Sequence, residues 1–221
     1  MNRLADLVSD LSPDGVEFKT LGDCVKRNLG GGTPSSSVSA YWGGEIPWAS
    51  VGDLSIPGNF IRTTRSYITP EGLSNSSSNL VAPGDVIVAV KISPGKTKIA
   101  AAEIAINQDL RGLTLHDFID NQFFAYYIQT VNIVGNGTIV KGITVETLER
   151  LRIPVPPLAV QLQIVKVLNN FTELEADLEA ELEARRHQYS YYRDSLLTFG
   201  EQGISKQASK QASKHPMGDV E

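Results

Sequence analysis

The sequence of 221 residues has little of what several protein classes require. Its one cysteine, Cys24, excludes an internal disulfide and a zinc site built from several cysteines, and it suits a reducing cytoplasm. No apolar run reaches about 18 residues, so we expect no transmembrane span and no membrane partner. Asp6 and Asp10 stand where a secretory signal would carry an apolar core, so no export is expected.

Motifs for catalysis and metal binding are also missing. The three histidines have no partner at metal-ligand spacing, so we expect no metal site. Gly30–Gly32 is followed by Thr33 and Pro34, whereas a phosphate-binding loop continues with Gly-Lys-Ser/Thr, and no Gly-x-Ser-x-Gly elbow occurs. Cys24 has no basic neighbour before Lys26, so we interpret it as a small core residue rather than a reactive thiol. We therefore expect no enzyme activity and no cofactor.

The negative net charge of −5 is unevenly distributed. Residues 1–157 hold 13 basic and 15 acidic side chains, whereas residues 158–199 hold 4 and 7. Within the first segment, Val86–Ala102 has three lysines and no carboxylate before Glu103. Because phosphate binding is decided by a local patch, the total charge does not exclude a nucleic-acid partner.

Residues 1–157 read as a β-rich domain. The strongest strand signal is the apolar run Val86–Val90 after Pro83-Gly84-Asp85. Helices are predicted over residues 120–133 and, behind a Thr144 cap, over residues 145–151. The Pro-rich stretch Ile153–Pro157 is extended and stiff, and we place the domain boundary there.

Residues 158–199 form one long predicted helix, because they contain no proline or glycine. Apolar and aromatic side chains recur there at heptad positions a and d, interrupted only by Glu175 and Arg185. A helix of this length would span about 63 Å and cannot bury such a seam alone, so it needs a partner helix. The predicted interface consists of Leu168, Phe171, Leu178, Leu182, Tyr189, Tyr192, Leu196 and Phe199.

Two tetrad repeats occupy the C-terminal part of the chain. The first, Leu-Glu-Ala-x, runs three times from Leu174 to Arg185 and keeps leucine on roughly one helix face. The second, Ser-Lys-Gln-Ala, lies within residues 200–221, which we predict to be a flexible tail because they lack large apolar residues.

Three basic segments are candidates for DNA contact. Lysines, hydroxyls and arginines in loops supply donors for phosphates and base edges, although solvated hairpin tips often carry lysines without binding anything. The candidates are the loop with Lys91, Ser93, Lys96, Thr97 and Lys98, the patch with Arg62 and Arg65, and the isolated Lys141. Trp42 and Trp48 are interpreted as core or turn packing.

Several stretches together resemble the specificity (S) subunits of type I restriction-modification systems. The similarity covers residues 1–200 and rests on the order and spacing of its motifs. One departure is Val160, where the family usually has glutamate. The motifs are PDGVEFKTLGD from Pro13, GTPS from Gly32, YWGGEIPW from Tyr41, NQDLRGL from Asn107, IPVPPL from Ile153 with Gln161, and QYSYYRDSLLTF from Gln188.

The resemblance implies an α+β fold, in which a β-rich target-recognition domain is followed by one long α-helix that pairs as an antiparallel coiled coil. Each such unit reads one half of a split double-stranded DNA site. Methyltransferase (M) subunits, which bind S-adenosylmethionine, and restriction (R) subunits join the complex, while the S subunit catalyses nothing. The number of Leu-Glu-Ala-x tetrads sets the gap between half-sites, although the tetrads also suit a merely stable, solvated helix.

A full S subunit holds two such units, and this chain resembles one. It is either a natural half-subunit or the first half of a full subunit, since Pro216–Glu221 faintly echoes Pro13–Glu17. In either case we expect a homodimer that suits a palindromic split site. Two alternatives remain at this point: a coiled-coil scaffold whose β-rich domain binds protein or carbohydrate, and the recognition part of a fused restriction-methylation enzyme.

Overall fold

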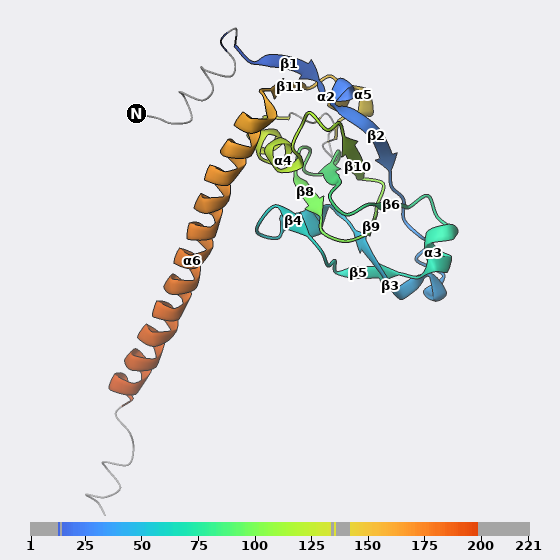
Figure 1. Cartoon of the computed structure of the whole chain (residues 1–221). Coiled ribbons are helices and arrows are strands. Elements are labelled where there is room, and N and C mark those ends of the chain that lie inside the picture. Colours follow the sequence, from blue (N-terminus) through green and yellow to red (C-terminus); the bar gives the residue numbers. More distant parts are fainter. Residues whose placement is uncertain (1–12, 14, 134, 136–141, 199–221) are drawn as a thin grey trace, which may run out of the picture. The chain divides into compact units, whose positions relative to one another are not determined.

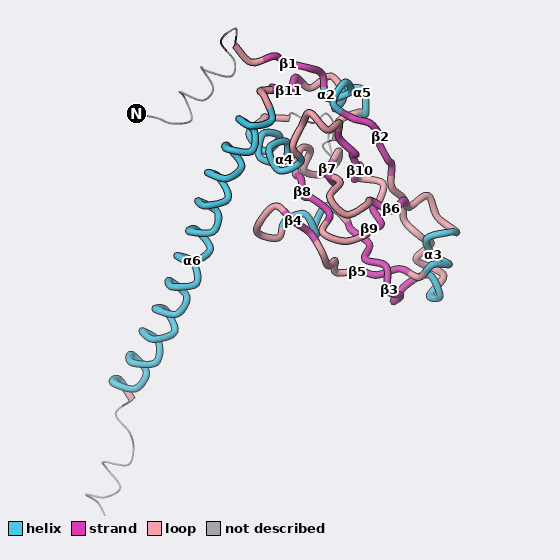
Figure 2. The backbone as a smooth tube through the Cα atoms, viewed as in Figure 1, coloured by secondary structure: helices cyan, strands magenta, loops and turns pink. Residues whose placement is uncertain are grey.

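The computed structural model describes residues 13, 15–133, 135 and 142–198. The chain divides into two compact units, residues 1–169 and residues 170–221. The first unit is built mainly from short strands and loops, and the second continues a single long helix (Figures 1 and 2). The structure therefore contains both a β-rich unit and a long helix after it, as expected from the sequence.

The largest sheet has five strands in the order β2-β10-β7-β8-β4. Neighbouring strands run antiparallel, except that β4 lies parallel to β8. The strand predicted at Val86–Val90 is confirmed at the centre of this sheet. The strands are β2 (Val25–Gly30), β10 (Leu110–Leu115), β7 (Val86–Ala89), β8 (Thr97–Ala100) and β4 (Phe60–Ile61).

A second sheet has four strands in the order β5-β3-β9-β6, and β1 (Glu17–Thr20) pairs separately with β11 (Arg152–Val155). In the four-stranded sheet β3 and β9 are parallel and the other pairs antiparallel. Its strands are β5 (Ser66–Ile68), β3 (Trp42–Ala49), β9 (Ile104–Ile106) and β6 (Asn79–Val81). The short helices that flank it are η1 (Ser39–Tyr41), η2 (Val51–Ser55) and α3 (Pro70–Ser74).

Strand β7 is buried on both faces. Val86 and Val88 point into one apolar cluster, with Phe124 and Leu113, whereas Ile87 and Ala89 point into the other. Because side chains alternate between the faces of a strand, only an uninterrupted apolar run fits such a position. The run Val-Ile-Val-Ala is therefore explained by two cores on opposite sides of one sheet.

The two helices predicted in the first unit are confirmed, and both are shorter than expected. Helix α4 spans Asn121–Thr130, and the Asp120 carboxylate accepts hydrogen bonds from the first free N–H groups at 2.9 and 2.8 Å. It ends before Ile133 because Val131 adopts an extended conformation. Helix α5 spans Val145–Glu149, with Thr144 as the predicted cap. The four-residue helix α2 spans Leu21–Cys24, and Cys24 is buried as predicted.

The glycine-rich loop after β2 is held by the two tryptophans. Trp42 donates its indole N–H to the carbonyl of Ser35 at 3.1 Å, and Trp48 donates to that of Gly32 at 3.0 Å. The two rings pack edge to face with centroids 5.2 Å apart. A Cβ on Gly31 would overlap the backbone carbonyls of Ile106 and Asn107, so glycine is needed for close approach of two chain segments. The tryptophans thus pack turns, as predicted.

Helix α6 spans Leu158–Leu197, which confirms the long helix within the described residues. Phe199, the last predicted seam residue, lies outside them. The fold class is therefore confirmed: a β-rich domain with mixed sheets is followed by one long helix. The division between the two units falls within this helix, after Asn169, because Val160, Gln161 and Val165 are buried in the first unit.

Gln161 joins three segments of the first unit through one buried amide. Its oxygen accepts from the N–H of Asp120 at 2.8 Å, and its nitrogen donates to the carbonyls of Phe118 at 2.9 Å and Pro156 at 2.8 Å. The side chain is fully buried. A neutral amide suits this position because it alone supplies both the acceptor and the two donors required.

We predict that Gln161→Ala lowers the free energy of unfolding by about 1–3 kcal/mol, because it leaves a buried N–H and two carbonyls without partners. Urea denaturation followed by circular dichroism measures this change. Gln163→Ala, on the same helical turn but partly exposed, is the matched control. Equal effects in the two variants would contradict the role of Gln161.

Candidate nucleic-acid interface

Helix η2 and the loop after it bring together two basic segments that are far apart in the sequence. The β4–β5 loop, with Arg62 and Arg65, meets the start of η2 through Asp53. The β7–β8 hairpin meets its end, where Lys96 donates to the Ser55 hydroxyl at 2.8 Å. Helix η2 therefore binds both the loop with Arg62 and Arg65 and the hairpin with Lys96.

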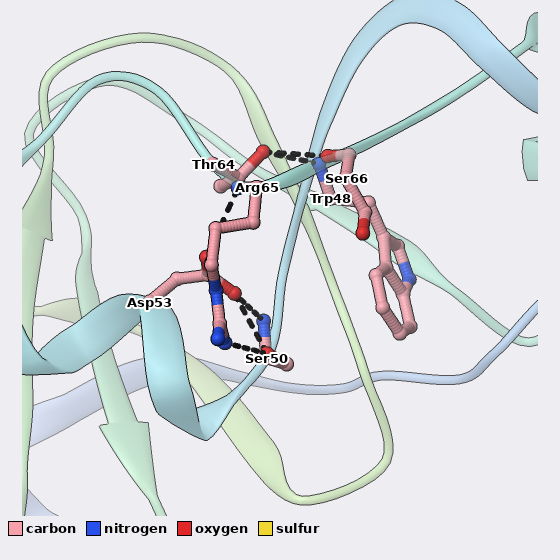
Figure 3. A network of polar contacts seen from close by, with 6 residues as sticks. All are labelled: Trp48, Ser50, Asp53, Thr64, Arg65 and Ser66. Atoms are coloured by element: carbon pink, nitrogen blue, oxygen red, sulfur yellow. Dashed lines mark hydrogen bonds and ion pairs between the residues drawn. The ribbon is translucent and has the colours of Figure 1, made fainter.

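Asp53 is the centre of the first contact. Its Oδ1 accepts from the backbone N–H of Arg65 at 3.0 Å and from Arg65 Nε at 2.9 Å (Figure 3). Its Oδ2 accepts from the backbone N–H of Ser50 at 2.9 Å and from the Ser50 hydroxyl at 2.7 Å. The Asp53 side chain is 5% exposed. Burial alone raises the pKa of Asp53, but these hydrogen bonds outweigh it and hold the pKa at about 2.

Arg65 is fixed in position yet open to solvent. Besides its bonds to Asp53, Nη2 donates to the Ser50 hydroxyl at 3.2 Å, while 70% of the side chain remains exposed. The guanidinium lies against Gly52, where a Cβ would overlap it. Figure 3 shows the side chain extended along Asp53 toward Ser50. The hydrogen bond to Asp53 and the charge of its carboxylate raise the pKa of Arg65.

A second set of bonds holds the same loop from the other side. The Thr64 hydroxyl accepts from the backbone N–H of Trp48 at 3.0 Å and donates to the carbonyl of Ser66 at 2.7 Å (Figure 3). Arg62 lies just before this anchored stretch and is exposed. Its guanidinium has no hydrogen bond or ion pair with any residue that the structure describes. The loop therefore presents one paired and one unpaired arginine.

The structure separates the five residues predicted in the lysine loop. Lys98 is 6% exposed, and its ammonium donates to the carbonyls of Ile56, at 2.6 Å, and Gly58. Burial and, to a lesser extent, Lys96 lower the pKa of Lys98. Thr97 is 2% exposed and donates to the carbonyl of Gly95 at 2.8 Å. Lys98 and Thr97 thus lie largely inside the domain, where backbone carbonyls accept their hydrogen bonds, rather than in the exposed loop that the sequence suggested.

Lys91 and Lys96 lie beside different cavities. Lys96 and Ser93 line a cavity of about 420 Å³ that also borders η2 and the end of α4. Lys91 lines another of about 620 Å³, and its ammonium forms an ion pair with Asp109 at 3.3 Å. Lys141, the third candidate, lies outside the described residues. Lys91 and Lys96 thus lie beside separate cavities, and Lys96 contacts η2, the helix whose Asp53 binds Arg65.

Sequence reasoning missed Asp53 and Ser50, which position Arg65. The sequence did contain a signal for the contact between these two residues. In the pattern Ser-x-x-Asp, the two side chains can accept hydrogen bonds from free backbone N–H groups at the start of a helix. The pattern would have predicted that Asp53 bonds to Ser50, but not that it also binds an arginine twelve residues away. That pairing depends on how β4 and β5 return the chain to η2.

The predicted helical interface is largely exposed in the single chain. Leu168 is half-buried, and each of the other described seam residues has more than half of its surface in solvent. They are Phe171, Leu178, Leu182, Tyr189, Tyr192 and Leu196. Such a row of exposed apolar side chains is unusual for a helix with no partner. The pairing of this helix stays a prediction.

No group of three or more potential metal ligands occurs among the described residues, and no described helix combines the length and hydrophobicity of a membrane span.

A family model described as the type I restriction modification DNA specificity domain matches residues 13–184. The chain belongs to this family. The match includes both the β-rich unit and most of helix α6, so the resemblance seen in the sequence is confirmed.

Relatives with curated names are specificity subunits as well. The chain is 30% identical over 216 residues to the type I restriction enzyme EcoR124I/EcoR124II specificity subunit of Escherichia coli, covering 90% of this chain and 52% of that one. It is 26% identical over 168 residues to the MjaIX specificity subunit of Methanocaldococcus jannaschii, covering 73% and 38%. The chain thus spans about half the length of the relatives it matches, or less.

Solved structures share the fold. The HsdS subunit from Thermoanaerobacter tengcongensis has a TM-score of 0.57 at 21% identity, covering 86% of this chain and 49% of that one. The type I S subunit from M. genitalium has a TM-score of 0.53 at 16% identity, covering 90% and 50%. The β-rich domain with its long helix is therefore an arrangement found in such subunits.

We predict that Asp53 makes acid stability depend on pH. Its pKa is lowered from an ordinary 3.8 to about 2 by folding. It therefore stabilises the fold above about pH 4, and this contribution, about 2 kcal/mol, disappears as the pH falls toward 2. Asp53→Asn should remove this component from urea unfolding measured between pH 5 and pH 2, values chosen to span roughly that window. Glu45→Gln, an exposed site, should keep the wild-type profile.

Proposed function

We propose that this chain is a non-catalytic DNA sequence-recognition unit of a type I restriction-modification complex. The observation that carries the proposal is the family match, which spans the recognition domain and most of the helix. The placement of exposed arginines and Lys96 around η2 supports it, because such a cluster offers donors to a DNA surface. The unit reads one half of a split site.

The long helix supplies the second part of the proposal. Two copies of the chain pair through the exposed seam of α6, which carries apolar side chains over several turns. The pair positions methyltransferase subunits, and restriction subunits join them. S-adenosylmethionine binds to the methyltransferase partner, and the chain itself takes no cofactor.

We predict that replacing Lys91 and Lys96 together by glutamine weakens DNA binding and makes it less sensitive to salt. For each phosphate that the protein no longer neutralises, the slope of log affinity against log salt becomes shallower by about 0.9. Gel shift or fluorescence anisotropy of the complex with its methyltransferase subunit measures both, on a duplex containing the site found by methylome sequencing.

The control for the lysine pair is Lys26→Gln with Arg150→Gln, which removes the same charge from exposed residues outside the candidate segments. An unchanged affinity at low salt in the Lys91/Lys96 variant would remove these lysines from the interface. A complex that neither binds nor methylates any DNA would contradict the proposed function itself.

We predict that Leu178→Glu with Leu182→Glu separates the dimer, because two carboxylates would have to be buried in the seam. Light scattering at micromolar concentration should show the mass of two chains for the wild type and of one chain for the variant. Ala180→Glu with Ala184→Glu adds the same charges outside heptad positions a and d, and should leave the dimer intact. A monomeric wild-type chain would contradict the pairing.

A further inference from the structure

We infer that Phe60 inserts between base pairs of the bound DNA and bends the duplex, and that Lys98 is the positioning residue that holds it in place. The inference rests on the proposed function and adds to it a distortion of the DNA by the recognition domain. It concerns the apolar turn, by which we mean residues 56–60, which run from the end of η2 into the edge strand β4.

The apolar turn exposes large hydrophobic side chains. Ile56 is 41% exposed and Phe60 is 49% exposed, and Pro57 between them is exposed as well. Ile61, the next residue, is fully buried, so the ring of Phe60 lies on the outer side of β4. Because apolar surface is unfavourable in water, a molecule that covers this turn gains binding free energy from it.

A buried lysine holds the apolar turn. Lys98 is 6% exposed, and its ammonium donates to the carbonyls of Ile56, at 2.6 Å, and Gly58. The N–H of Ile99, the next residue of β8, donates to the carbonyl of Asn59 at 2.7 Å. No carboxylate among the described residues forms an ion pair with Lys98. A charge buried without a counterion costs free energy, and here it fixes the position of an exposed turn before DNA arrives.

The surroundings of the apolar turn favour DNA as its partner. Residues 54–66 hold two arginines and no carboxylate, and the carboxylate just before them, that of Asp53, is buried and paired with Arg65. Arg62 is exposed two residues after the turn, and Lys96 lies against the end of η2 just before it. Cations at both ends of the turn suit the phosphates on either side of a base step, whereas protein interfaces are depleted of lysine.

The chemistry of Phe60 points to insertion. An apolar ring gains little from phosphates or from the polar edges of bases. It gains by leaving water against the faces of bases, and these faces are accessible in a duplex only where a base step opens. Phenylalanine, isoleucine and proline are residues with which DNA-bending proteins open such steps, and the apolar turn carries one of each.

The experiment uses the chain assembled with its methyltransferase subunit and a duplex containing its methylated site. Energy transfer between dyes at the two ends reports bending, and 2-aminopurine in place of single adenines reports loss of stacking. The wild-type complex should kink the duplex by about 20–90° and brighten 2-aminopurine at a step other than the methylated adenine, which methyltransferases flip by themselves. Phe60→Ala should reduce the bend, lose this brightening and bind about 5- to 150-fold more weakly, the range for a lost stack between a base and an aromatic ring.

Three variants separate insertion from a general loss of structure or charge. Phe18→Ala removes a phenylalanine that is 47% exposed but lies in β1, outside the candidate segments, so bending and affinity should stay as in the wild type. Phe60→Leu keeps an apolar wedge and should keep most of the bend. Arg62→Gln should make the salt slope shallower by about 0.9 and keep the 2-aminopurine signal, whereas Phe60→Ala should keep the salt slope. Circular dichroism confirms that each variant is folded.

Lys98→Met tests the positioning role. Methionine keeps the long side chain without the charge, and the carbonyls of Ile56 and Gly58 can bond to water because both residues are exposed. The variant should therefore stay folded, yet its bend should fall toward that of Phe60→Ala although Phe60 is unchanged. An unaltered bend in the folded Lys98→Met complex would remove Lys98 from the inference.

Three results would overturn the insertion of Phe60. The first is equal bending by the wild type and Phe60→Ala. The second is a loss of affinity that replacing one thymine by uracil reproduces without a change in bending, which marks a contact with the thymine methyl group. The third is a Phe60→Ala chain that no longer assembles with the methyltransferase subunit, which marks a protein docking site. These differ from failure of the proposed function, in which the wild-type complex neither binds nor methylates DNA.

Discussion

The burial of β7 on both faces is the constraint on which the recognition domain depends. A strand with a core on each side cannot carry polar groups along its length, so the polar side chains gather where the chain enters and leaves it. The hairpin that follows β7 carries the lysines, and its partner β8 is the strand that receives β4. From β4 the chain continues directly into the loop with Arg62 and Arg65. The core therefore decides where the basic residues appear.

Within this framework, two buried charges organise the surface. Asp53 binds the β4–β5 loop to η2, and Lys98 binds the turn after η2 to the β7–β8 hairpin. Each satisfies its charge with hydrogen bonds from a neighbouring segment, as a buried charge must. One short helix is thereby attached to both basic loops. The global charge of −5 is compatible with this local arrangement, because much of it lies on the helix α6.

Much of the fold could be predicted from local signals. The apolar run of β7, the cap at Thr144 and the proline-free stretch before Phe199 each have a local physical cause, and each corresponds to an element of the structure. The end of α4 was misjudged, because the apolar residues Val131 and Ile133 continue the pattern after the backbone has become extended. The candidate site was predicted less well. Lys98 and Thr97 look like surface donors in the sequence, yet they point inward.

The β-rich domain, the long helix with its apolar seam and the family all followed from the sequence alone, because strand patterning, helix propensity and motif order are properties of neighbouring residues. The assembled fold was needed to show which basic residues face solvent and which are held by a carboxylate. Lys96 and Lys98 are two residues apart and differ in burial, and Arg62 and Arg65 differ in pairing. Both differences depend on contacts with η2 or with the turn after it, and contacts between segments distant in the chain are formed only when the sheets assemble.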